Sequence, residues 1–163
     1  AAAISTGILG SEVAAYHQPW LRERSNDYPE DVRERIQANM FIPAVDYIKA
    51  HQGRVRFTQS VSDVMEDLDV LVMPTEPITA PRIGQAMVVI GGEEYPVQGL
   101  LTLFTRIFNI TGMPAMSVPC GFDGRGLPVG LQIAGKPFDE ATVLRLAHAY
   151  EQATPWHGQR PSL

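Results

Sequence analysis

Residues 115–133 read AMSVPCGFDGRGLPVGLQI, and this stretch predicts a β-hairpin. The runs 115–122 and 128–133 are mostly apolar and have the length of ordinary strands. Between them, the residues DGRG (123–126) supply turn chemistry, because glycine tolerates the positive φ that tight turns need. The rest of the predicted fold is built outward from this hairpin.

Upstream of the hairpin, residues 69–74 (DVLVMP) form a short apolar run closed by proline. Such runs are typical of strands that are buried on both faces of a largely parallel sheet. Residues 75–84 contain two prolines and predict an irregular loop. Residues 87–97 predict a small second hairpin around Gly91-Gly92.

Helices are expected on either side of residues 115–133. An apolar helical face precedes the hairpin, and Asp139 is placed to cap a final helix that follows it. The preceding face comprises Leu100, Leu101, Phe104 and Phe108, and the final helix presents Val143, Leu146, Ala147 and Tyr150.

The first third of the chain predicts helices separated by prolines. Residues 3–17 have helical composition, and Pro19 is expected to end that helix. A second helix should begin after Pro29, and Pro43 should kink or break it. The helix should then resume and run to about Gln59.

Helices that flank strands in this way predict an α/β layered fold. Four or five strands are few for a free-standing sheet of this type. The opening residues AAAI lack an initiator methionine and resemble the middle of a helix. Both observations favour a portion of a larger domain over a whole one.

Composition narrows the class of protein. Hydrophobic residues make up 45% of the 163 residues and charged residues 19%, which is a globular balance. The net charge of −5 argues against a nucleic-acid partner, and no apolar run reaches the roughly 18 residues of a membrane span. Cys120 is the only cysteine, so an internal disulfide and a four-cysteine metal site are excluded, and a cytoplasmic setting is expected.

No motif for catalysis or metal binding stands out. The four histidines are not at metal-ligand spacing, and no serine lies in a GxSxG elbow. Ser117 is interpreted as a serine in mid-strand and Cys120 as a small buried residue. A Ser-His-Asp triad stays open, because triads assemble from residues far apart in sequence.

Three stretches together carry a family resemblance. They are residues 69–75 (DVLVMPT) with 80–84 (APRIG), residues 104–121 (FTRIFNITGMPAMSVPCG), and residues 126–135 (GLPVGLQIAG) with 138–144 (FDEATVL). In this order and spacing, they resemble the C-terminal portion of amidase-signature enzymes, including the A subunit of glutamyl-tRNA amidotransferase. The resemblance covers nearly the whole chain, residues 1–163, and is weakest before Asp69.

The resemblance implies amide hydrolysis by a serine nucleophile, a second serine in a cis peptide and a lysine base. In the family these groups lie in a Gly- and Ser-rich loop region of the N-terminal half, which this sequence lacks. Lys49 and Lys136 are not in a matching context, so no catalytic residue is assigned here. The implied partners are the N-terminal half of the polypeptide and a small amide, without cofactor or metal, and a homodimer stays open.

The resemblance also implies a fold of three α/β/α layers around a mixed sheet, in which this portion forms one wall of the substrate pocket. Loops at strand ends hold ligands in α/β sheets, so we expect the loop from Thr75 to Gly84 and the helix around Thr102 to Arg106 to line that wall. Arg35 is a candidate for meeting a substrate carboxylate. For Arg106 the alternative is a salt bridge between the sheet and helix layers.

Thr102 bears on the subtype. The A subunit of glutamyl-tRNA amidotransferase typically has an aspartate at the position of Thr102, where it would meet the amino group of glutamine. Thr102 cannot supply that charge, and no acid lies nearer to it in the sequence than Glu94. The sequence therefore favours a general amidase, while a non-catalytic module that binds a partner or small molecule remains the alternative of a different class.

Overall fold

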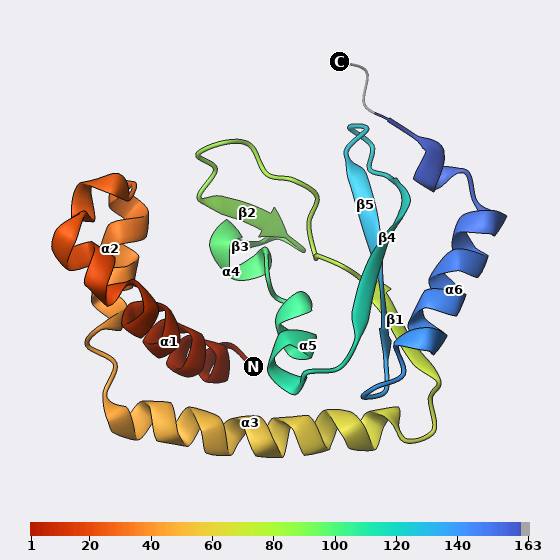
Figure 1. The fold of residues 1–163 in the computed structure, drawn as a ribbon. Coiled ribbons are helices and arrows are strands. Elements are labelled where there is room, and N and C mark those ends of the chain that lie inside the picture. Colours follow the sequence, from red (N-terminus) through yellow and green to blue (C-terminus); the bar gives the residue numbers. More distant parts are fainter. Residues whose placement is uncertain (161–163) are drawn as a thin grey trace. The chain divides into compact units, whose positions relative to one another are not determined.

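The computed structural model describes residues 1–160 and divides into two compact units, Ala1–Ser60 and Val61–Leu163 (Figure 1). The first unit is helical. It contains α1 (Ala2–Glu23), a 3-10 helix (Ser25–Asp27), α2 (Glu30–Asn39) and most of α3 (Ala44–Met65).

The prolines of the first unit act differently from one another. Pro19 lies inside α1, so the prediction that it ends the helix is wrong. Proline removes one backbone donor, but Leu21 beyond it is buried, and its packing favours continuing the helix. Pro43 does break the helix, since α2 ends at Asn39 and α3 begins at Ala44. The α3 helix runs to Met65 rather than to Gln59.

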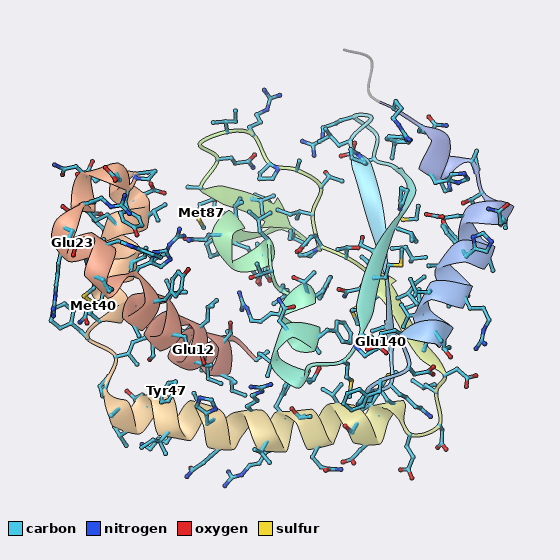
Figure 2. The ribbon with its side chains drawn as sticks, in the orientation of Figure 1. Glu12, Glu23, Met40, Tyr47, Met87 and Glu140 are labelled. Carbon is cyan, nitrogen blue, oxygen red and sulfur yellow. The ribbon has the colours of Figure 1, made fainter. Side chains whose placement is uncertain are left out.

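Small residues allow close packing in the first unit. A Cβ on Gly7 of α1 would lie 2.7 Å from the Cβ of Ala50 on α3. The two helices therefore approach to a distance that only glycine permits at this position. Tyr47 lies on α3 (Figure 2), and the centroid of its ring is 4.5 Å from that of His51, one helical turn further on.

The second unit is built around a three-stranded sheet in the order β1-β5-β4. Its strands are β1 (Val70–Pro74), β4 (Ala115–Phe122) and β5 (Pro128–Gly135). The predicted hairpin is confirmed as β4 and β5, joined by a turn in which Gly126 adopts a φ of 79°. A register shift between Pro119 and Gly121 leaves Cys120 in a bulge.

Helices cover both faces of this sheet. On one face, α6 (Glu140–Ala153) packs Val143 and Ala147 against Val118 and Ile133 (Figure 1). On the other face, Met65 at the end of α3 and Phe108 pack with Met113 and Ala134; Phe108 belongs to α5 (Thr105–Thr111). The second unit is therefore an α/β/α arrangement, as predicted.

The sheet itself differs from the expectation. Within residues 1–160 every strand pair is antiparallel, so the predicted mixed, largely parallel sheet is not found in this chain. The strand β5 lies between β4 and β1 and runs antiparallel to both of them. Val72 on β1 is 46% exposed, so the prediction that 69–74 is buried on both faces is wrong.

Three shorter elements follow β1. Residues 75–84 form no helix or strand, which confirms the predicted loop. The second hairpin is confirmed as β2 (Met87–Ile90) and β3 (Glu93–Pro96). A short helix, α4 (Val97–Leu100), and a turn then lead into α5.

Of the helices described, none has the length and apolar character needed to cross a membrane.

The final helix begins as the sequence predicts. The Asp139 side chain accepts a hydrogen bond from the backbone N–H of Thr142, which is the N-cap geometry. Glu140 follows in the first turn, where the helix dipole favours an acid (Figure 2). Of the expected apolar face, Val143 and Ala147 are buried.

Candidate functional site

The loop after β1, residues 75–84, is fastened to the β4–β5 turn through Asp123. Thr79 donates its hydroxyl to Asp123 Oδ2 at 2.7 Å, and Arg125 donates to Thr79 Oγ1 at 2.7 Å. Asp123 Oδ1 also accepts the backbone N–H groups of Arg125 and Leu127, at 2.8 and 2.9 Å. One carboxylate therefore organises its own turn and holds a loop 44 residues upstream.

These donors stabilise the charged form of the carboxyl. The hydrogen bond from the Leu127 backbone lowers the pKa of Asp123 most, and the bond from the Thr79 side chain lowers it further. The Arg125 guanidinium, 3.1 Å from Asp123 Oδ2, works in the same direction. Asp123 is thus ionised wherever the protein is folded near neutral pH.

Replacing Asp123 with asparagine should destabilise the protein at pH 7. A carboxyl whose pKa is lowered by folding contributes stability that is fully present above its unfolded pKa, about 3.9, and is lost as the pH falls through the folded value. The gap between the urea midpoints of the wild type and Asp123→Asn should therefore shrink as the pH is lowered towards and below that unfolded pKa. A difference between the two urea midpoints that stays the same at every pH would contradict this prediction. Asp67→Asn, at an exposed aspartate, serves as the control.

Thr75 is joined to the sheet as well as to the loop. Its backbone N–H donates to the carbonyl of Gly130 at 2.8 Å, and its hydroxyl lies 2.6 Å from the hydroxyl of Ser117. A Cβ on Gly130 would lie 2.6 Å from Thr75 Oγ1 and 2.7 Å from Ser117 Oγ. The two hydroxyls can meet because residue 130 is glycine. The sequence pattern indicates only a strand serine at Ser117, and nothing in it signals the contact with Thr75.

The other two predicted residues of the second unit are adjacent. Arg106 Nη2 donates to Thr102 Oγ1 at 2.5 Å, across one turn of the chain that leads into α5. This hydrogen bond, rather than a salt bridge, is the partner that the structure gives to the Arg106 guanidinium. Thr102 is exposed, so its side chain is accessible from the solvent.

An acid does lie beside this helix, although the sequence places it far upstream. Burial raises the pKa of the Glu76 carboxyl, and a hydrogen bond with the Thr105 side chain works in the opposite direction. Within residues 1–160, Glu76 Oε2 is buried without a hydrogen-bond partner. Glu94 is therefore not the acid to consider at this helix; the fold brings Glu76 there from the loop after β1.

Arg35 lies on α2 in the first unit, where it is exposed. The structure therefore brings Thr102 to Arg106 and Thr75 to Ser117 within the second unit, while the assignment of Arg35 to the same site stays a prediction. All four assignments to substrate binding, at Arg35, Thr75, Thr102 and Arg106, remain predictions.

Three further side chains, His17, Cys120 and Lys136, have hydrogen-bond partners in the structure. His17 Nδ1 lies 2.8 Å from the Tyr28 hydroxyl, and the Cys120 thiol donates to the Val129 carbonyl at 3.5 Å. Cys120 is half-buried rather than buried, because it lies at the bulge. Lys136 donates to the Glu66 carbonyl at 2.9 Å, just beyond the end of α3. No group of three or more metal-binding side chains comes together in the part of the chain described.

Sequence comparison finds a matching family. A family model described as Amidase matches residues 10–144. The chain is 41% identical over 150 residues to the A subunit of the glutamyl-tRNA(Gln) amidotransferase of Thermodesulfovibrio yellowstonii, covering 88% of this chain and 30% of the relative. It is 37% identical over 163 residues to an amidase of Pseudomonas putida, covering 98% of this chain and 34% of the relative. The chain thus spans about a third of the length of these relatives.

Structure comparison gives the same result. A crystal structure of an amidase matches with a TM-score of 0.85 and 26% identity, covering 92% of this chain and 34% of that one. A bacterial aryl acylamidase of the amidase-signature family matches with a TM-score of 0.72 and 26% identity, covering 94% and 34%. The antiparallel sheet and its flanking helices are therefore part of a fold that continues, in these proteins, well beyond the matched region.

Proposed function

Because the chain belongs to the amidase family, we propose that it is the C-terminal portion of an enzyme that hydrolyses a carboxylic amide to an acid and ammonia or an amine. In this proposal the chain contributes strands and one wall of the substrate pocket. The serine nucleophile and lysine base come from the N-terminal part of the polypeptide.

One observation carries the assignment of a wall. Two pairs of polar side chains lie within the second unit, at Thr75 with Ser117 and at Thr102 with Arg106. Thr75 directly follows β1, and Thr102 and Arg106 lie in the segment that enters α5, so each pair includes a residue from a segment expected to line the pocket. The fastening of residues 75–84 by Asp123 supports the same role, since binding residues must be held in place by their surroundings.

The A subunit of glutamyl-tRNA amidotransferase is the second candidate, and the 41% identity to such a protein favours it. Thr102 argues against it, because a threonine hydroxyl cannot neutralise the ammonium group of glutamine. The two candidates differ in a measurable way. A general amidase should prefer simple aliphatic or aromatic amides over glutamine, and the amidotransferase component should show the reverse preference.

The proposal predicts no turnover by residues 1–163 alone and turnover by the polypeptide that includes the N-terminal part. A general base needs a lysine held neutral beside a serine, and neither lysine of this chain is so placed: Lys136 bonds the Glu66 carbonyl and Lys49 is exposed. The test measures ammonia release from acetamide, benzamide and glutamine, once with the isolated chain and once with the longer polypeptide. Ammonia release by the isolated chain, or none by the longer polypeptide, would contradict the proposal.

A further inference from the structure

Around Gly130, one face of the sheet carries polar groups that have more hydrogens to donate than acceptors to receive them. Gly130 and Gln132 are two residues apart on β5, so their side-chain directions share a face. The missing Cβ of Gly130 points at the hydroxyls of Thr75 and Ser117, which places the Gln132 side chain on the face that carries these hydroxyls. In the strand register, Gln132 stands directly opposite Ser117.

Gln132 is the only polar or charged residue among those classed as buried in residues 1–160. Its exposed fraction is 3%, and its Nε2 has no hydrogen-bond partner among the described residues. A buried amide N–H without an acceptor destabilises the folded state, because it has given up its hydrogen bonds to water. Such a group therefore calls for an explanation beyond the contacts of the described residues.

The hydroxyl pair adds a further donor. The hydroxyl oxygens of Thr75 and Ser117 lie 2.6 Å apart, so one hydroxyl donates to the other, and within residues 1–160 the hydrogen of the accepting hydroxyl has no acceptor. Ser117 is exposed, which makes this hydrogen available to a ligand. Gln132 adds its buried Nε2, with two further hydrogens, to the same face of the sheet. A group that offers oxygen lone pairs complements them, and a group that offers N–H does not.

We propose that Ser117, with Gln132 beside it, forms a donor subsite that takes a carbonyl oxygen of the amide substrate, in addition to the amide that is cleaved. This inference rests on the proposed amidase function. It names the class of substrate: an amide whose acyl chain carries a second carbonyl or carboxylate oxygen. Gly130 belongs to the subsite because any side chain there would displace the two hydroxyls.

The test compares pentanamide with 3-oxopentanamide and 4-oxopentanamide, which differ from it by one carbonyl oxygen. In the full-length enzyme, Ser117→Ala should lower kcat/KM for at least one oxo-amide by about tenfold more than it lowers kcat/KM for pentanamide, as expected for one lost hydrogen bond. Gln132→Met, which keeps the length of the side chain and removes its donors, should act in the same direction. Ser60→Ala, an exposed serine on α3, is the control and should leave all three substrates unchanged.

Each result supports or overturns the subsite. An equal loss on all three amides means that these side chains act without contacting the second oxygen, and it overturns the proposed subsite. No loss on either oxo-amide overturns it as well. If the wild type hydrolyses none of the three amides, the proposed amidase function fails for this class of substrate and the subsite fails with it. If Gln132→Met does not fold, the exposed Ser117→Ala still decides the question.

Discussion

Replacing Ile133 with alanine is expected to lower the free energy of unfolding by about 2–5 kcal/mol. Ile133 lies on β5, the central strand of the sheet, and its exposed fraction is 1%. It packs with Val118 of β4 and with Val143 and Ala147 of α6. Truncation therefore leaves a cavity where strand and helix meet, and β5 cannot move to fill it because it is paired on both sides.

Urea unfolding of the full-length enzyme, followed by tryptophan fluorescence and by circular dichroism, measures this loss. Leu144→Ala is the control, since Leu144 lies on α6, the helix that packs against Ile133, but is 57% exposed. It should change the stability by less than about 0.5 kcal/mol. Equal effects of the two substitutions would mean that α6 does not cover the sheet as described.

The sequence predicted well where local chemistry decides the structure. Residues 115–135 form the expected hairpin because the turn needs a residue with positive φ, and Gly126 provides it. The last helix begins at Asp139 because its side chain can bond the backbone N–H of Thr142. Pro43 breaks a helix where an interior proline would clash with the preceding turn. Each of these depends on residues within a few positions of one another.

Features set by distant contacts were not predicted. The direction of β1 relative to its neighbour depends on which strand it meets, and an apolar run of five or six residues does not specify that. The extent of α3 to Met65 follows from the packing of Met65 against Phe108 and Met113. Likewise α1 continues through Pro19, and a local rule for proline gives no weight to the burial of Leu21.

The residues of the candidate site also fall into those that the sequence predicted and those that it did not. The family resemblance led to Thr75, Thr102 and Arg106, and the structure gives each of them a specific partner. It did not lead to Asp123, for which the sequence indicates turn chemistry alone, because its bond to Thr79 spans 44 positions. Pairs of ordinary polar residues at such separations carry no periodicity or spacing by which they can be found.

The substitution with the largest expected effect on specificity is the double variant Thr75→Ala, Thr102→Ala in the full-length enzyme. If both hydroxyls line the pocket wall, each loss removes one hydrogen-bonding group from the substrate's surroundings, which is equivalent to about tenfold in relative kcat/KM. Thr75 bonds Ser117 and Thr102 bonds Arg106, so the two sites share no partner and their effects should add. The ratio of kcat/KM between an aromatic and an aliphatic amide should therefore change by about 10- to 100-fold.

The control for this double variant is Thr154→Ala, which removes a hydroxyl bonded to the Tyr150 carbonyl at the end of α6. It should leave the ratio unchanged, because the ratio cancels any general loss of folded enzyme. The single variants separate the two contributions, and Thr102→Ala also releases the Arg106 guanidinium from its partner. Released arginine should favour amides that carry a carboxylate, so hydrolysis of such a substrate should fall less than that of a neutral amide. Unaltered ratios across aromatic, aliphatic and carboxylated amides would mean that neither the loop after β1 nor the start of α5 contacts the substrate.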